Sequence, residues 1–155
     1  MRTLKSIFIF SSILLLGYTA QAQIPPVDNN GVAIGGYDVV SYFSGEAKRG
    51  FESFSVKYNG ATYYFFTKSD RAAFNKSPEK YLPQFDGFCA WGVGAKSAKF
   101  PIDPESYDIV DGKLYLFFNA PFNGEQFNTI LDWNKRTTEL QKAAYANWPK
   151  VKNSK

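Results

Sequence analysis

The sequence predicts an α+β fold, in which a small antiparallel sheet built from two β-hairpins packs with short helices and a long C-terminal helix. Two turn dipeptides, Asn59-Gly60 and Asp111-Gly112, are each flanked by apolar segments, and this is the strongest short-range signal for a hairpin. Apolar residues also recur at helical spacing between residues 124 and 148. These features indicate one domain of mixed structure, and no internal repeat is evident in the sequence.

The first 22 residues have the features of a secretory signal peptide. Arg2 and Lys5 precede an apolar run, and Ala20-Gln21-Ala22 supplies an A-x-A cleavage site. The apolar run is too short for a comfortable membrane span, which takes about 20 residues. We therefore expect an exported chain, periplasmic or secreted after cleavage near Ala22, whose mature part has no stable membrane span.

The mature chain is expected to divide into three parts. Residues 23–35 are rich in Pro, Gly and Asn and show no periodicity, which predicts a linker or an extended arm. Residues 36–149 form the domain, and residues 150–155 form a flexible tail.

The domain is expected to begin with a helical turn and a hairpin. Asp38 is placed to cap a short helical segment at residues 39–43. Residues 51–58 and 61–66 flank the Asn-Gly turn and are predicted to pair as antiparallel strands.

Two short helical segments and an irregular segment are expected next. Thr67 or Ser69 can cap a helix at residues 69–77, and a Pro then begins a second short turn at residues 78–82. Residues 84–106 hold several glycines and prolines without a regular pattern, so we expect functional residues there.

The last part of the domain is predicted to be a second hairpin and a helix. Residues 107–110 and 113–118 flank the Asp-Gly turn and are expected to pair. The helix is expected over residues 124–148, and Pro149 is expected to end it.

Composition excludes several function classes. The chain has no histidine, so Ser-His-Asp and Cys-His catalytic units, imidazole general bases and histidine metal ligands are all excluded. No other catalytic constellation is recognisable, and we expect a protein that is not an enzyme. The 18 basic and 14 acidic residues are interspersed along the chain, so no nucleic-acid partner is expected.

Soft-metal binding is also disfavoured by composition. Cys89 is the only cysteine, and the only methionine is the initiator. One thiolate cannot form a tetrahedral or trigonal site, so no metal site is predicted and Cys89 is at most a weak candidate ligand. A transition-metal site would need a dimer, a haem-like cofactor that supplies its own ring nitrogens, or hard oxygen ligands. The sequence implies no cofactor.

Five residues are candidates for a ligand site, and all lie near glycines or aromatic residues: Tyr37, Asp38, Asp86, Cys89 and Trp91. Cys89 has two interpretations: a small side chain packed in the core, or an exposed thiol whose pKa is lowered by nearby backbone N–H groups. Asp86 can cap a helix, form a turn or lie beside the thiol.

Several segments match, in order and spacing, the motifs of one known family. They are Gly36-Tyr37-Asp38-Val39-Val40-Ser41-Tyr42-Phe43, Tyr58-Asn59-Gly60, Tyr63-Tyr64-Phe65, Phe74, Pro78-Glu79-Lys80-Tyr81-Leu82-Pro83, Gly87-Phe88-Cys89-Ala90, Val110-Asp111-Gly112-Lys113-Leu114-Tyr115-Leu116 and Asn147-Trp148-Pro149. On these residues the chain resembles the YHS-domain family, of the small exported kind that carries the domain alone.

The resemblance implies a fold more firmly than an activity. The family is associated with metal handling, including copper-transporting ATPases, whose related domains carry the pattern Tyr-Tyr-Phe-Cys-Ser-x-x-Cys. The positions that match the two cysteines are Phe66 and Asp70 in this chain, so the resemblance carries no metal site over.

Two functional hypotheses follow. The first is an exported, non-enzymatic YHS-domain module that binds a small ligand or a protein partner, with the segment from Gly87 to Gly94 and the region of Tyr37 forming one wall of the site. The second is a thiol- or metal-handling protein in which an exposed, ionised Cys89 serves in redox chemistry or metal delivery, alone or across a dimer.

Overall fold

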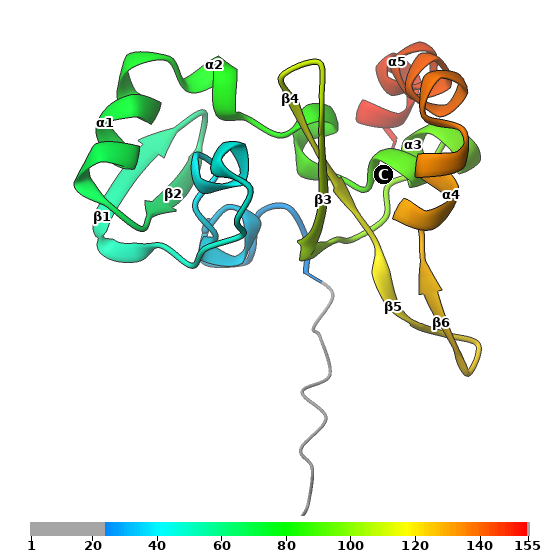
Figure 1. Ribbon diagram of the computed structural model, residues 1–155, viewed down its shortest axis with the longest axis horizontal. Helices are drawn as coiled ribbons and strands as arrows, with labels where there is room; N and C mark the ends of the chain where they lie inside the picture. The colour runs from blue at the N-terminus through cyan, green and yellow to red at the C-terminus, as the bar shows by residue number, and fades with distance from the viewer. Residues whose placement is uncertain (1–23, 155) are drawn as a thin grey trace, which may run out of the picture.

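The computed structural model describes residues 24–154 and confirms the α+β class (Figure 1). The predicted signal peptide at residues 1–22 lies outside the described residues. None of the helices within residues 24–154 is long and apolar enough to cross a membrane.

Six strands in the described part of the chain pair as three separate two-stranded antiparallel sheets, and not as the single sheet predicted. The strands are β1 (Phe51–Tyr58), β2 (Ala61–Phe65), β3 (Asp103–Val110), β4 (Lys113–Phe117), β5 (Asn119–Phe122) and β6 (Glu125–Asn128). The edges of the two predicted hairpins are occupied by other segments: Val32 pairs with Thr62 of β2, and Pro83 pairs with Leu114 of β4. These isolated bridges take the place of pairing between the hairpins.

Helices surround these sheets at both ends of an elongated molecule. The helices are η1 (Ile34–Gly36), η2 (Ser41–Ser44), α1 (Lys68–Lys76), α2 (Pro78–Tyr81), η3 (Gln84–Gly87), α3 (Ala90–Lys96), α4 (Ile130–Lys135) and α5 (Thr137–Lys152). Figure 1 shows β1, β2, α1 and α2 at one end, and α3, α4, α5 and the β5–β6 hairpin at the other, with β3 and β4 between them.

The two halves of the domain repeat one backbone geometry, which the sequence did not reveal. Residues 34–36 and residues 85–87 are each three consecutive residues with positive φ. In each half a helical turn follows, and then a hairpin whose register shifts near the start of its first strand, between Phe51 and Ser55 in β1 and between Asp103 and Tyr107 in β3. We call residues 34–83 the first repeat and residues 85–152 the second repeat.

A ten-residue segment interrupts the second repeat. In the first repeat, Phe66 and Thr67 connect β2 to α1, and Thr67 Oγ1 caps that helix by accepting a hydrogen bond from Asp70 N at 3.0 Å. In the second repeat, Phe118 and Thr129 hold the corresponding places, and the β5–β6 hairpin lies between them. The backbone N–H of Thr129 donates to Phe118 O at 3.0 Å, so the two ends of this segment meet.

The β5–β6 hairpin corrects the predicted helix at residues 124–148. Asn123 and Gly124 have φ of 53° and 85° and form the turn between β5 and β6, so an Asn-Gly pair ends a strand here as it does at residues 59–60. The helical part begins only at Ile130, and α5 at Thr137.

Pro149 lies inside α5, and the prediction that it ends the helix is wrong. The helix continues through Lys152 because Val151 is buried in the core, which stabilises the turn beyond the proline. Lys99 Nζ donates to Lys152 O at 3.0 Å, and this bond satisfies a carbonyl at the end of the helix.

The segment predicted to be irregular, residues 84–106, holds η3, α3 and the start of β3. Helix α3 packs closely on α5, because a Cβ on Gly94 would lie 2.6 Å from Leu140 O. Asn147 Nδ2 donates to Val93 O at 3.0 Å and joins the same two helices. The absence of a side chain at Gly94 therefore permits this helix pair.

Candidate functional site

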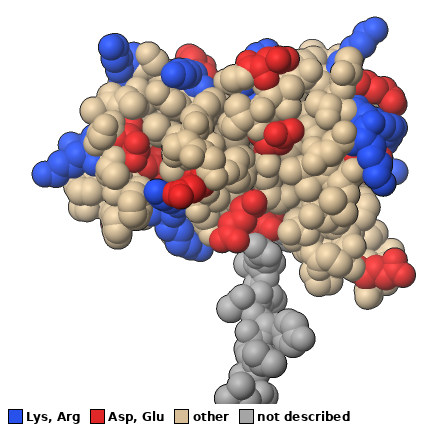
Figure 2. Space-filling view, in the orientation of Figure 1, with Lys and Arg blue, Asp and Glu red and all other residues tan. Residues whose placement is uncertain are grey.

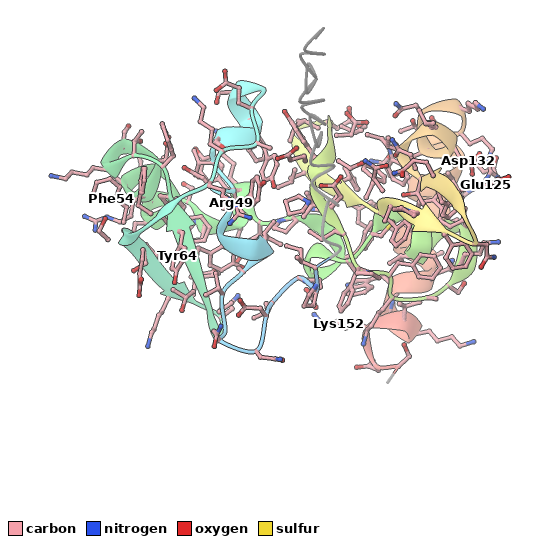
Figure 3. The ribbon with its side chains drawn as sticks, turned by 90° about the horizontal axis from the view of Figure 1, so that it is seen from below. Arg49, Phe54, Tyr64, Glu125, Asp132 and Lys152 are labelled. Atoms are coloured by element: carbon pink, nitrogen blue, oxygen red, sulfur yellow. The ribbon has the colours of Figure 1, made fainter. Side chains whose placement is uncertain are left out.

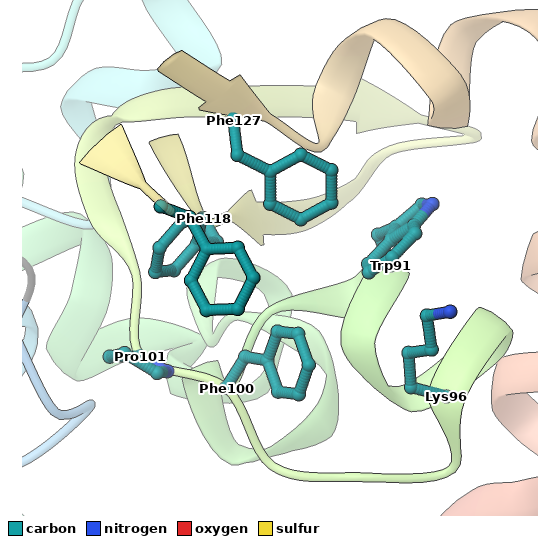
Figure 4. Close-up of a pocket in the computed structure, with 7 residues that line it drawn as sticks. Trp91, Lys96, Phe100, Pro101, Phe118 and Phe127 are labelled. Atoms are coloured by element: carbon teal, nitrogen blue, oxygen red, sulfur yellow. The ribbon is translucent and has the colours of Figure 1, made fainter. Parts of the chain in front are cut away.

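A groove lined by aromatic side chains lies in the second repeat and has a volume of about 580 Å³ (Figure 4). Its lining residues are Trp91, Lys96, Phe100, Pro101, Phe118, Phe122 and Phe127. We call this set the aromatic groove. Its size lies within the ~300–1,000 Å³ typical of sites for small ligands.

Three parts of the fold contribute to the aromatic groove. Helix α3 and the segment after it provide Trp91 and Phe100, whose ring centroids lie 6.1 Å apart. Phe118 follows directly on β4, and the β5–β6 hairpin provides Phe122 and Phe127. The Trp91 and Phe127 rings meet edge to face at 5.3 Å, so the hairpin closes one side of the groove.

Trp91 is held in a fixed orientation. Its indole Nε1 donates to Asp132 Oδ2 at 2.6 Å, and the same carboxylate pairs with Arg136 Nη2 at 2.5 Å. The hydrogen bond from Arg136, and then the one from Trp91, lower the pKa of Asp132, so the carboxylate is ionised at neutral pH. The ring is therefore preorganised on the groove, and Trp91 is the one sequence candidate that lines it.

The sequence missed the other lining residues. Phe122 and Phe127 fell within or beside the predicted helix at residues 124–148, where they would not have formed a hairpin. The signal that identifies this hairpin is the Asn-Gly pair at residues 123–124, between two phenylalanines.

Cys89 is fully buried and caps α3. Its Sγ accepts hydrogen bonds from the backbone N–H of Gly92 at 3.4 Å and of Phe118 at 3.3 Å. Thr129 Oγ1 lies 3.5 Å from Sγ and 2.9 Å from Phe118 O. Burial raises the pKa of the Cys89 thiol, and these hydrogen bonds only partly oppose that effect.

Asp38 is also fully buried, and its role is structural. Its Oδ1 accepts from the backbone N–H of Val40 at 2.8 Å and of Ser41 at 3.3 Å, which confirms the predicted cap. The helical turn that follows is η2, which begins two residues later than predicted. Oδ2 accepts from Phe66 N at 2.8 Å. Burial, together with the nearby Asp70 carboxylate, raises the pKa of Asp38 to about 6 despite these donors.

Asp38 and Cys89 therefore occupy equivalent positions in the two repeats. Each side chain accepts from the backbone three residues ahead and from the first N–H after the hairpin, at Phe66 or Phe118. A carboxylate in one repeat and a thiol in the other perform the same capping function. This equivalence accounts for Cys89 without any chemical reactivity.

Tyr37 lies away from the aromatic groove. Its hydroxyl donates to Glu105 Oε1 at 2.9 Å, and the Arg49 guanidinium lies 5.0 Å from its ring centroid. Figure 3 places Arg49 between Phe54 at one end of the molecule and Asp132 at the other. Tyr37 and Asp38 line neither the aromatic groove nor the second cavity described next.

Asp86 lies at a second cavity of about 360 Å³, where the arm, β2 and the end of α5 meet. Its Oδ2 pairs with Lys152 Nζ at 3.1 Å, and both side chains are more than half exposed. The backbone of Asp86 has a φ of 51°, as in a tight turn, and its carboxylate is paired with Lys152. Of the roles expected for Asp86, the structure therefore supports that of a turn residue. The same cavity is lined by Tyr63, and burial raises the pKa of that phenol to about 12.

Lys and Arg are interspersed with Asp and Glu on the face shown in Figure 2, and they form no basic patch on it. Within residues 24–154, no three His, Cys, Asp or Glu side chains gather closely enough to hold a metal ion. Comparison with protein-family models, with curated proteins and with solved structures finds no match.

Proposed function

We propose that this chain is an exported, non-enzymatic module of the YHS-domain type whose aromatic groove binds a small ligand with an apolar body. The observation that carries the proposal is the groove itself. Its lining combines a nearly buried Trp91 with Phe122, which is 59% exposed. Exposed aromatic surface of this kind is unfavourable in water, and covering it with a ligand is favourable.

The groove is suited to binding because its walls are fixed before a ligand arrives. Asp132 orients Trp91, and Phe118 follows directly on β4. Gly92 allows the Phe100 ring to pack on α3, since a Cβ there would lie 3.0 Å from Phe100 Cγ. A preorganised site loses less entropy when it binds.

No specific observation favours the alternative of a thiol- or metal-handling protein. That hypothesis requires an exposed, ionised Cys89. The thiol has no exposed surface, and burial raises its pKa.

The experiment is a titration of the mature protein with naphthalene-2-carboxamide, a neutral two-ring probe, followed by calorimetry and by amide chemical shifts. We expect binding with shifts at Trp91 and Phe127. Phe122→Ser should weaken the affinity about tenfold, because it removes an apolar contact worth about 1–1.5 kcal/mol. Phe51→Ser is the matched control, since Phe51 is 52% exposed on β1 and lies outside the groove.

The proposal fails if the probe does not bind, or if Phe51→Ser weakens binding as much as Phe122→Ser does. Shifts confined to the cavity beside Asp86 would also contradict it.

A further inference from the structure

We infer that the ligand of the aromatic groove is an amphipathic anion, with an aromatic or other flat apolar body and one negatively charged group that binds Lys96. This inference rests on the proposed function and specifies the chemical class of its ligand. It is carried by the charge and the hydrogen-bonding capacity of the lining.

Lys96 is the single charged residue of the lining. It lies in the last turn of α3, and its Nζ is 5.5 Å from the centroid of the Trp91 ring. None of the ion pairs found among residues 24–154 includes Lys96. Its ammonium group is therefore placed to pair with an anion that the protein does not supply.

No other side chain of the lining offers a hydrogen-bond donor to a ligand. The Trp91 indole N–H is already bonded to Asp132 at 2.6 Å. The remaining members of the set are phenylalanines and a proline, whose side chains have no polar atoms. A polar group on the ligand therefore finds a side-chain donor only at Lys96, and a cationic group there would be repelled.

The position of Lys96 sets the orientation of the ligand. Figure 4 shows Lys96 beside Trp91 and Phe100, at the opposite side of the groove from Pro101. The apolar body of the ligand packs on the aromatic rings that line the groove, and the anionic end reaches the rim at α3.

The first repeat shows a contrasting arrangement. There Lys48 lies 5.2 Å from the ring of Phe66, the counterpart of Phe118, and forms an ion pair with Glu46. The cation beside that ring is neutralised within the chain, and no inserted hairpin builds a groove around it. The second repeat differs in both respects. It has the inserted hairpin, and Lys96 takes part in none of the ion pairs found among the described residues.

The test compares naphthalene-2-carboxylate with naphthalene-2-carboxamide, which have the same rings and nearly the same shape. At low ionic strength we expect the carboxylate to bind about fivefold more tightly than the amide. Lys96→Met should remove this preference, because it removes the charge that distinguishes the two probes. Lys57→Met is the control, because Lys57 is exposed on β1, far along the chain from the groove. Raising the salt concentration should weaken only the carboxylate.

Equal affinities for the two probes would overturn the inference and leave the proposed function standing. The same holds if Lys96→Met weakens both probes equally, or if Lys57→Met weakens the carboxylate as much as Lys96→Met does. If neither probe binds, both the inference and the proposed function fail.

Discussion

The carboxylate of Asp38 and the thiol of Cys89 each accept a hydrogen bond from the first peptide N–H after a hairpin, at Phe66 and Phe118 respectively. Both side chains are fully buried, and burial raises the pKa of each. At the scale of single residues, the two groups have the same hydrogen-bond geometry. Only the Asp38 carboxyl, with a pKa of about 6, changes its protonation state near neutral pH.

The native protein should protect Cys89 from thiol reagents. Because the sulfur is buried and un-ionised, its labelling requires opening of the structure. We expect labelling by an aromatic disulfide reagent to be at least ~100-fold slower in native buffer than in denaturant. Rapid labelling of the folded chain would contradict the capping role and support a reactive thiol.

The stability contributed by Asp38 should depend on pH. Its folded pKa of about 6 lies above the ordinary value of 3.8, so the folded chain retains a proton that the unfolded chain has lost. This contribution is fully present below about pH 4 and is lost as the pH rises through about 6, which lowers the free energy of unfolding by about 2–3 kcal/mol.

Urea denaturation of the wild type and of Asp38→Asn, from pH 4 to pH 7, measures this effect. The stability difference between the two proteins should shift against the wild type over that range. A difference that does not change with pH would show that the carboxylate titrates at its ordinary pKa.

At the scale of elements, the contact between α3 and α5 depends on one position without a side chain. Gly94→Ala would place a methyl group 2.6 Å from Leu140 O and force the helices apart. We expect the free energy of unfolding to fall by about 2–3 kcal/mol, as overpacking does. Gly45→Ala is the control: Gly45 has open space around it and a φ of 86°, so backbone strain alone should cost about 1 kcal/mol. Equal losses in urea denaturation would refute the close helix contact.

Local turn chemistry predicted most of these elements, and the misplaced ones have identifiable causes. Asn59-Gly60 and Asp111-Gly112 gave both predicted hairpins, and Thr67 gave the cap of α1. The apolar residues after Phe122 match helical spacing as well as strand spacing, so periodicity alone could not identify β6. Pro149 was misread because the burial of Val151, which holds the last turn of α5, is a tertiary effect.

At the scale of the whole molecule, the sequence showed neither the repeat nor the groove. The two repeats share positive φ values and hairpin register, but their side chains differ, as Asp38 and Cys89 illustrate. The inserted hairpin also shifts every later residue out of register. Of the five candidate residues, only Trp91 lines the aromatic groove, because reactive or polar side chains predict chemistry, whereas this groove is built by the packing of apolar rings.

Removal of the β5–β6 hairpin should therefore separate binding from folding. A chain that lacks residues 119–128 joins Phe118 to Thr129, as Phe66 joins Thr67 in the first repeat. We expect it to unfold cooperatively with a loss of about 1–3 kcal/mol, since the 3.0 Å bond from Asn119 to buried Asp103 disappears. Calorimetry should show that the naphthalene probes no longer bind. Unchanged affinity, or loss of cooperative unfolding, would contradict this view of the hairpin.

The meeting of Phe118 and Thr129 has a further consequence for protein engineering. A segment whose two ends meet can be transplanted with little disturbance of the acceptor, and the junction between Phe66 and Thr67 has the matching local geometry. The ten residues from Asn119 to Asn128 can therefore be moved to another site as one unit. Grafted at that junction, they would show whether the first repeat accepts an inserted hairpin as the second repeat does.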